Sequence, residues 1–224
     1  MTGLVDTALD RAVVPGYTKI GYWLRRLGWD RDDPRPGSLT GKRALVTGGS
    51  SGLGKASALG LARLGAVVHL VVRNEERGRE ALVELRGELP GAELHLEVCD
   101  VSDLAAVRRF ATDLLSRVGS IDVVVHNAGT LPAERTESVD GHEASVATHV
   151  LGPLLLTELL GPVLSGRDAR VILVSSGGMY TQRLPVDDPD YRGDGYRGTI
   201  AYARSKRMQV ALAPLMQRRW AAEN

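Results

Sequence analysis

Apolar and polar residues follow two spacings along most of this chain. Short runs rich in branched aliphatic residues predict five strands, at 43–46, 67–72, 94–98, 121–125 and 171–174. Segments whose apolar residues recur every three or four positions predict helices, at 54–64, 75–88, 103–118, 143–164 and about 199–221. Strands that alternate with helices indicate an α/β fold, in which helices cover both faces of a parallel sheet.

Two stretches depart from this alternation. Pro153 and Pro162 fall inside the segment 143–164, and we expect them to bend or end its helix. The polar segment 177–198 predicts a loop, which either borders a substrate entrance or is a solvated surface.

Residues 1–38 form a separate pattern. Apolar residues recur at helical spacing over 4–13 and again over 17–27, and Pro15 separates the two stretches. A polar stretch with further prolines and a glycine follows as a linker. We therefore expect an N-terminal helical arm and linker at 1–38, and one α/β domain at 39–224.

The composition narrows the class of protein. Hydrophobic residues make up 43% of the chain and charged residues 25%, as in soluble globular proteins. The formal net charge of +1 excludes a general electrostatic nucleic-acid binder, which needs a strongly basic face. The best apolar run, Val150 to Leu164, is shorter than a spanning helix needs and contains Glu158, so no such helix is predicted.

The single cysteine, Cys99, excludes an internal disulfide and a cysteine-rich metal site, and we expect no metal. We interpret Cys99 as a small core residue rather than a reactive thiol. A free thiol fits a reducing compartment, so we expect a cytoplasmic protein.

A glycine-rich loop follows the first predicted strand and opens the first helix. It predicts a site for the pyrophosphate of a dinucleotide, because glycines allow a tight turn and a helix N-terminus supplies free N–H groups. The candidate binding residues of the loop are Gly48, Ser50, Ser51, Gly52, Leu53 and Gly54. The alternative is a glycine-rich turn that binds no ligand, whereas a Walker loop is excluded because Lys55 follows Gly54 directly.

The end of the second strand predicts which dinucleotide binds. Sites for NAD usually have an acidic residue there, which binds the ribose 2′-hydroxyl. In this chain Arg73 and Asn74 occupy the position, and a guanidinium matches a 2′-phosphate instead. We therefore predict NADP as the cofactor, with NAD as the second choice. The alternative is that Arg73 is only a solvated charge.

Tyr202 and Lys206 are four residues apart in the last predicted helix and so lie on one face of it. A phenol alone is a poor acid–base at neutral pH, but a nearby ammonium favours the phenolate. The pair can therefore move a proton to or from a substrate oxygen.

Together these residues resemble the short-chain dehydrogenase/reductase family. The motifs follow the family's order, and they are the glycine loop 47–54, Asp100-Val101, Asn127-Ala128-Gly129, Ser175-Ser176, and Tyr202 with Lys206. The spacing of the loop glycines resembles that of the family's single-domain oxidoreductases. A narrower similarity, carried by residues 17–22, 175–179 and 206–207, is to the branch named dehydrogenase/reductase member twelve.

The resemblance implies a doubly wound, Rossmann-like sheet of strand order 3-2-1-4-5, and hydride transfer between NADP(H) and a carbonyl or alcohol substrate. It implies that Tyr202 is the acid–base, that Ser176 donates a hydrogen bond to the substrate oxygen, and that Lys206 holds the nicotinamide ribose and tunes Tyr202. The other cofactor contacts that it implies are Asp100 and Val101 at the adenine, and Asn127, Ala128 and Gly129 after the fourth strand.

The chain departs from the family pattern at two places. His149 stands where the family usually has an asparagine that kinks the helix and holds a water of the proton relay. A histidine can hold a water and titrates near neutrality, so His149 is a catalytic candidate; the alternative is a satisfied structural histidine. The family also continues past the Tyr–Lys helix with two more strands and a substrate lid. We therefore expect a C-terminally truncated domain, either a fragment or one completed by another chain.

Two other functions stay open on the sequence. The early end and His149 favour a non-catalytic nucleotide-binding or assembly protein, whereas the intact Ser176, Tyr202 and Lys206 favour an enzyme. The apolar stripe 17–27 with its basic flanks allows contact with a membrane surface, although such a stripe more often packs on the protein or on a second subunit. A bare fifth strand favours self-association, so we expect a homo-oligomer with a small-molecule substrate and no nucleic-acid partner.

Overall fold

The computed structural model describes residues 18–29, 34–164 and 168–223. Contacts divide the chain into two units, Met1–Pro36 and Gly37–Asn224. The larger unit contains the sheet and every predicted site residue.

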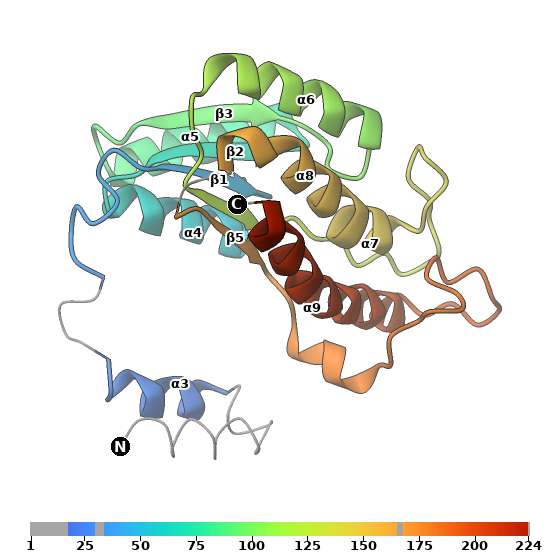
Figure 1. Ribbon diagram of the computed structural model, residues 1–224. Coiled ribbons are helices and arrows are strands. Elements are labelled where there is room, and N and C mark those ends of the chain that lie inside the picture. Colours follow the sequence, from blue (N-terminus) through green and yellow to red (C-terminus); the bar gives the residue numbers. More distant parts are fainter. Residues whose placement is uncertain (1–17, 30–33, 165–167, 224) are drawn as a thin grey trace. The chain divides into compact units, whose positions relative to one another are not determined.

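The larger unit is built around a five-stranded parallel sheet (Figure 1). Its strands are β1 (Arg43–Thr47), β2 (Val67–Val72), β3 (Leu94–Val98), β4 (Val123–His126) and β5 (Arg170–Leu173). Their order is β3-β2-β1-β4-β5, which confirms the predicted doubly wound α/β fold. The second and third strands have the predicted bounds, whereas the fourth begins at Val123 rather than Ile121.

Two pairs of helices cover the two faces of the sheet (Figure 1). These helices are α4 (Gly52–Arg63), α5 (Glu75–Glu88), α6 (Leu104–Arg117) and α8 (Gly152–Leu164). Side chains alternate between the faces of a strand, so Ala44 and Val46 of β1 pack with α4 and α5. Leu45, between them, packs with α6 and α8 on the opposite face. The aliphatic core is therefore divided into two layers by the sheet.

The predicted helix 143–164 is interrupted by a wide turn. α7 (Ala144–Val146) continues into a π-helical turn, η1 (Ala147–Leu151), and α8 follows. The helix does not end at the prolines, because Pro153 and Pro162 both lie within α8. Pro153 follows the π-helical turn directly, where the hydrogen-bonding register of the helix has changed and the Gly152 N–H donates to the Ala147 carbonyl.

The segment Ala144–Leu164 is also long and apolar enough, by length and composition alone, to span a membrane. The sequence analysis did not predict this. However, 56% of its most apolar window is buried within the protein, where α8 packs against α6. This burial is typical of the core helix of a globular domain.

The last elements of the chain lie beside η1. A 3₁₀ turn, η2 (Gly177–Thr181), follows β5 within the predicted loop, and α9 (Gly198–Glu223) packs against α7, η1 and η2. Among the described residues β5 pairs with β4 alone, and none of its residues is fully buried.

In the smaller unit the structure describes one helix, α3 (Lys19–Arg26), which lies within the predicted apolar stripe 17–27. The predicted helix at 4–13 lies outside the described residues.

Candidate active site

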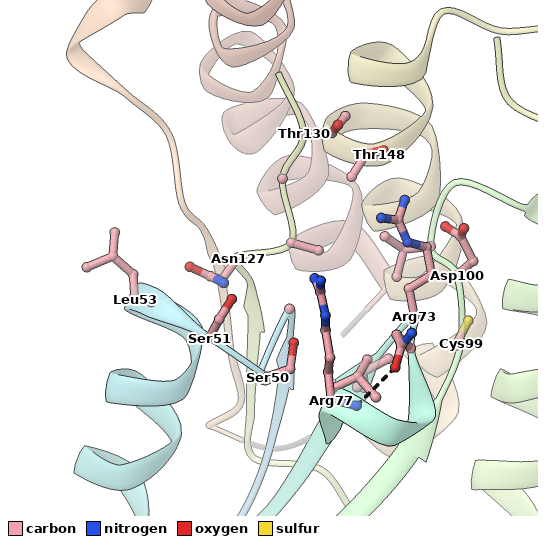
Figure 2. Close-up of a pocket in the computed structure, with 18 of the residues that line it drawn as sticks. Ser50, Ser51, Leu53, Arg73, Arg77, Cys99, Asp100, Asn127, Thr130 and Thr148 are labelled. Carbon is pink, nitrogen blue, oxygen red and sulfur yellow. Dashed lines mark hydrogen bonds between the residues drawn. The ribbon is translucent and has the colours of Figure 1, made fainter. Parts of the chain in front are cut away.

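A cavity of about 590 Å³ opens at the carboxyl ends of the central strands (Figure 2). Small-molecule sites usually have this size, and doubly wound sheets bind ligands at this edge. The predicted site residues that line it are Gly48, Ser50, Ser51, Gly52, Leu53, Arg73, Asn74, Asp100, Val101, Asn127, Ala128, Gly129 and Tyr202. The other four, Gly54, His149, Ser176 and Lys206, lie outside this lining.

The glycine loop is shaped by a close approach of backbone to backbone. Gly48 has a φ of 69°, a left-handed conformation that favours glycine. A Cβ at Gly54 would lie 2.2 Å from the carbonyl oxygen of Gly48, so the start of α4 packs directly on the loop. Gly54 therefore shapes the loop without lining the cavity, and Gly52 and Leu53 at the start of α4 remain on its wall.

The loop after β4 is tied to the end of β1. The Thr47 hydroxyl accepts hydrogen bonds from the backbone N–H groups of Asn127 and Ala128, both at 3.0 Å. The Asn127 side-chain amide donates to the Thr47 carbonyl at 3.1 Å. Asn127 thus fastens the two central strands together at the cavity.

Two arginines reach into the cavity, Arg73 from the end of β2 and Arg77 from the first turn of α5 (Figure 2). Asn74 lies between them and caps α5, because its side-chain oxygen accepts a hydrogen bond from the backbone N–H of Arg77 at 2.9 Å. The sequence analysis missed Arg77. The signal that could have found it is the i, i+4 spacing of the two arginines.

Asp100 is held rigidly after β3. Its carboxylate accepts hydrogen bonds from the backbone N–H and the hydroxyl of Ser102, at 2.9 and 2.7 Å. The neighbouring Val101 carbonyl meets the start of α8, where a Cβ at Gly152 would lie 1.9 Å from its oxygen. Cys99 also lines the cavity, but burial raises the pKa of its thiol to about 12, which fits a small core residue rather than a reactive thiol.

Ser176, Tyr202 and Lys206 come from the η2 turn and α9. Ser176 caps η2, and its hydroxyl oxygen accepts a hydrogen bond from the Gly178 N–H at 3.2 Å. Lys206 is buried and donates to the Val174 carbonyl at 2.7 Å. Its ammonium lies 5.5 Å from the centre of the Tyr202 ring. Burial lowers the pKa of Lys206 to about 8, so the ammonium form predominates at neutral pH.

His149 is fully buried in η1, and both of its ring nitrogens have partners. Nε2 accepts a hydrogen bond from the Thr130 N–H at 3.0 Å, which makes Nδ1 the protonated nitrogen. Nδ1 donates to the Ser205 hydroxyl at 2.8 Å, and that hydroxyl donates to the Tyr202 carbonyl. Burial, with the charge of Lys206, lowers the pKa of His149 to about 3. The expectation that it titrates near neutrality is therefore wrong, and these contacts favour the structural interpretation.

Two further contacts of His149 involve residues that the sequence analysis missed or did not connect with it. The Gln209 side-chain amide donates to the His149 carbonyl at 2.8 Å. The imidazole also meets the Tyr202 ring edge-on, with centroids 5.4 Å apart. His149 thus links the loop after β4 with the helix that carries Tyr202.

The polar loop 177–198 is largely exposed and is anchored by one buried tyrosine. Tyr191 is buried, with a φ of 48°, and its hydroxyl donates to the Gly195 carbonyl at 2.9 Å. The Arg204 guanidinium lies 4.1 Å from the centre of the Tyr191 ring. No residue of 177–198 lines the cavity described above. The loop is therefore mostly a solvated surface, and it does not border the cavity described above.

Comparisons with known proteins identify the family of the chain. The family described as short chain dehydrogenase matches residues 42–185. The bovine dehydrogenase/reductase SDR family member 12 is 38% identical over 206 residues, which cover 92% of this chain and 63% of the relative. The chain therefore spans less than two thirds of the length of this relative.

Solved structures show the same fold. An uncharacterized protein from Mycobacterium paratuberculosis superposes with a TM-score of 0.74 at 33% identity, covering 87% of this chain and 68% of that protein. The Pseudomonas aeruginosa RhlG/NADP active-site complex superposes with a TM-score of 0.66 at 28% identity, covering 84% of this chain and 70% of that chain.

Proposed function

The chain belongs to the short-chain dehydrogenase/reductase family, and from that premise we propose that it transfers a hydride between NADP(H) and a carbonyl or alcohol substrate. One observation carries the proposal: Tyr202, from the Tyr–Lys pair, lies on the wall of the same cavity as the glycine loop. A dinucleotide bound along that loop would therefore extend toward an acid–base group.

The residues of the cavity fit a dinucleotide with a 2′-phosphate. The backbone N–H groups at Gly52 and Leu53 would bind the pyrophosphate, since they begin α4 and line the cavity. Arg73 and Arg77 would bind the 2′-phosphate, because two guanidinium groups share that part of the wall. Asp100 would meet the adenine.

The catalytic roles follow from the contacts of three side chains. When bound, NADPH supplies the hydride to the carbonyl carbon. The Tyr202 hydroxyl gives its proton to the carbonyl oxygen, and the nearby Lys206 ammonium stabilises the phenolate that results. The Ser176 oxygen already accepts from Gly178, so its own O–H is available to hold the substrate oxygen.

A turnover assay with the full 224-residue chain tests this function. Oxidation of NADPH is followed by absorbance with a panel of aldehydes and ketones, and reduction of NADP⁺ with the matching alcohols. NADPH binding is measured in parallel by fluorescence. We expect binding and turnover of at least one substrate. Binding without turnover of any of them would favour the non-catalytic nucleotide-binding protein.

A further inference from the structure

Helix α3 carries an apolar stripe on its surface. Four apolar residues of the helix and its C-cap recur at positions i, i+3, i+4 and i+7, a spacing that gathers them on one side. Their exposed fractions are Ile20 65%, Trp23 64%, Leu24 44% and Leu27 78%. Gly21 is the only residue of this helix that is buried. The stripe is therefore open in the described part of the chain, although apolar surface of this kind is normally covered.

The rest of the helix is basic. Lys19, Arg25 and Arg26 are its charged residues, and positions 18–29 contain no Asp or Glu. Helical spacing places Lys19 and Arg26, seven residues apart, together along one border of the stripe, and Arg25 on the side away from it. An apolar stripe bordered by basic side chains matches a surface that is apolar below and anionic above.

An aromatic residue strengthens that match. Trp23 lies within the stripe, whereas helical spacing places Tyr22 on the other side of the helix, where its ring packs edge-to-face against that of Trp29 with centroids 5.5 Å apart, so Trp23 alone carries this match. Indole rings have an apolar body and a polar atom, so they favour the boundary between acyl chains and headgroups.

We propose that α3 binds the surface of an anionic membrane. The helix lies in the plane of the interface, with Ile20, Trp23 and Leu27 inserted at the headgroup boundary. Lys19 and Arg26 then reach the lipid phosphates along the border of the stripe. This binding needs neither the cofactor nor turnover, so it stands apart from the proposed hydride transfer.

The charges on α3 favour a membrane, rather than a second copy of the chain, as the surface that covers the stripe. Two α3 helices paired through their stripes would bring Lys19 and Arg26 of both copies together, with no carboxylate on the helix to balance them. An anionic lipid surface supplies the balancing charge. Three aspartates follow the helix in the sequence, within 30–33, and they oppose attraction by charge alone. Insertion of the stripe is therefore required as well.

Co-sedimentation of the full chain with lipid vesicles tests the proposal. One set of vesicles is phosphatidylcholine alone, and the other is phosphatidylcholine mixed with phosphatidylserine. We expect the protein to pellet with the anionic vesicles, and less so at high salt. Replacement of Lys19 and Arg26 by Gln should weaken this binding by about fivefold for each charge removed. Trp23→Glu with Leu27→Glu should abolish it.

A matched control keeps the result specific. Val83→Glu changes another exposed apolar residue, on α5 of the larger unit, and should pellet like the wild type. Fluorescence titration with NADPH, without vesicles, checks that each variant is folded. Equal pelleting with neutral and anionic vesicles, or none with either, would overturn the proposal. A different pair of results would also overturn it: the wild type does not pellet with either set of vesicles, and on a sizing column it runs as a dimer that Trp23→Glu with Leu27→Glu converts into a monomer.

Discussion

Strands β1 and β5 belong to one sheet, yet they support the site in different ways. Each β1 residue from Ala44 to Thr47 is buried, and neighbouring strands flank β1 on both sides. β5 pairs with β4 alone among the described residues, and its side chains are half-buried or exposed. The glycine loop and the arginines lie around the buried centre, which we call the cofactor half. Ser176, Tyr202 and Lys206 lie around β5 and α9, which we call the catalytic half.

The two halves are also held by different forces. Close backbone approaches at Gly48 and Gly54 shape the cofactor half, together with side-chain hydrogen bonds between Thr47 and Asn127. Side-chain hydrogen bonds across elements hold the catalytic half, as where Lys206 reaches the Val174 carbonyl. A substitution in one half should therefore leave the other half's function largely intact.

The largest expected effect is in the catalytic half. Tyr202→Phe removes only a hydroxyl, so the fold and NADPH binding should survive. Turnover should fall by about 100-fold or more, the usual contribution of a general acid. Tyr180→Phe is the control, since Tyr180 is an exposed tyrosine of η2 outside the cavity lining. Steady-state rates and NADPH dissociation constants are compared for both variants. Unchanged turnover in Tyr202→Phe would remove Tyr202 from the mechanism.

The next effect is in the cofactor half. Arg73→Asp should repel the 2′-phosphate and raise the NADPH dissociation constant roughly 10- to 100-fold, as expected for loss of a charge-assisted hydrogen bond. NADH binding should change little or improve. Arg77→Gln should act in the same direction but more weakly, whereas Arg79→Gln, on an exposed part of the same helix, should have no effect. Fluorescence titrations of the wild type and the three variants with both nucleotides give the dissociation constants. Equal affinity of the wild type for NADH and NADPH would show that the arginines do not select NADP.

The cofactor half was also the more predictable from sequence. Its residues follow one another within short motifs at the ends of strands, so strand prediction alone places them at one edge of the sheet. Arg77 was missed because it lies inside a helix with several other surface arginines. The catalytic half depends on contacts between distant positions: His149 meets Ser205 and Gln209 across 56 and 60 residues. No local pattern indicates these contacts.

The π-helical turn shows the same limit. The prolines at 153 and 162 suggested a break in the helix, but the break lies before them, at η1. Directly after η1, Gly152 packs closely against the Val101 carbonyl. This is a tertiary contact, which no local sequence pattern indicates.

His149 connects the two halves, and its replacement should mainly cost stability. His149→Asn is too short to keep both the Thr130 N–H and the Ser205 hydroxyl bonded. Each buried polar group left unpaired costs about 1–3 kcal/mol. We expect a lower free energy of unfolding in urea and a loss of turnover smaller than that of Tyr202→Phe. His142→Asn, at a partly exposed histidine, is the control. A stable His149→Asn variant without turnover would instead support the proton relay.

The smallest expected effect is a difference in acid stability between the halves. Burial alone would raise the pKa of Glu97 on β3, but hydrogen bonds from His69 and Arg117 and their charges lower it to about 2. The folded pKa of Glu97 is below its ordinary value of 4.5, so the stability that Glu97 provides is fully present only well above pH 4.5 and is lost as the pH falls toward 2. His149 has a folded pKa of about 3, whereas a free imidazole has a pKa of 6.5. The stability that neutral His149 provides is therefore lost progressively as the pH falls below 6.5.

The two windows can be separated by unfolding in urea at a series of pH values. His149→Asn should flatten the dependence of the unfolding free energy on pH between 6.5 and about 5.5, where Glu97 contributes little. Glu97→Gln should flatten it mainly at lower pH. Glu93→Gln is the control, because this exposed carboxylate lies just before β3. The Glu93→Gln variant should follow the wild type at every pH. If Glu97→Gln left the slope below pH 4.5 unchanged, the Glu97 carboxylate would not be held in the low-pKa ion pair with Arg117, and β3 would lack this anchor.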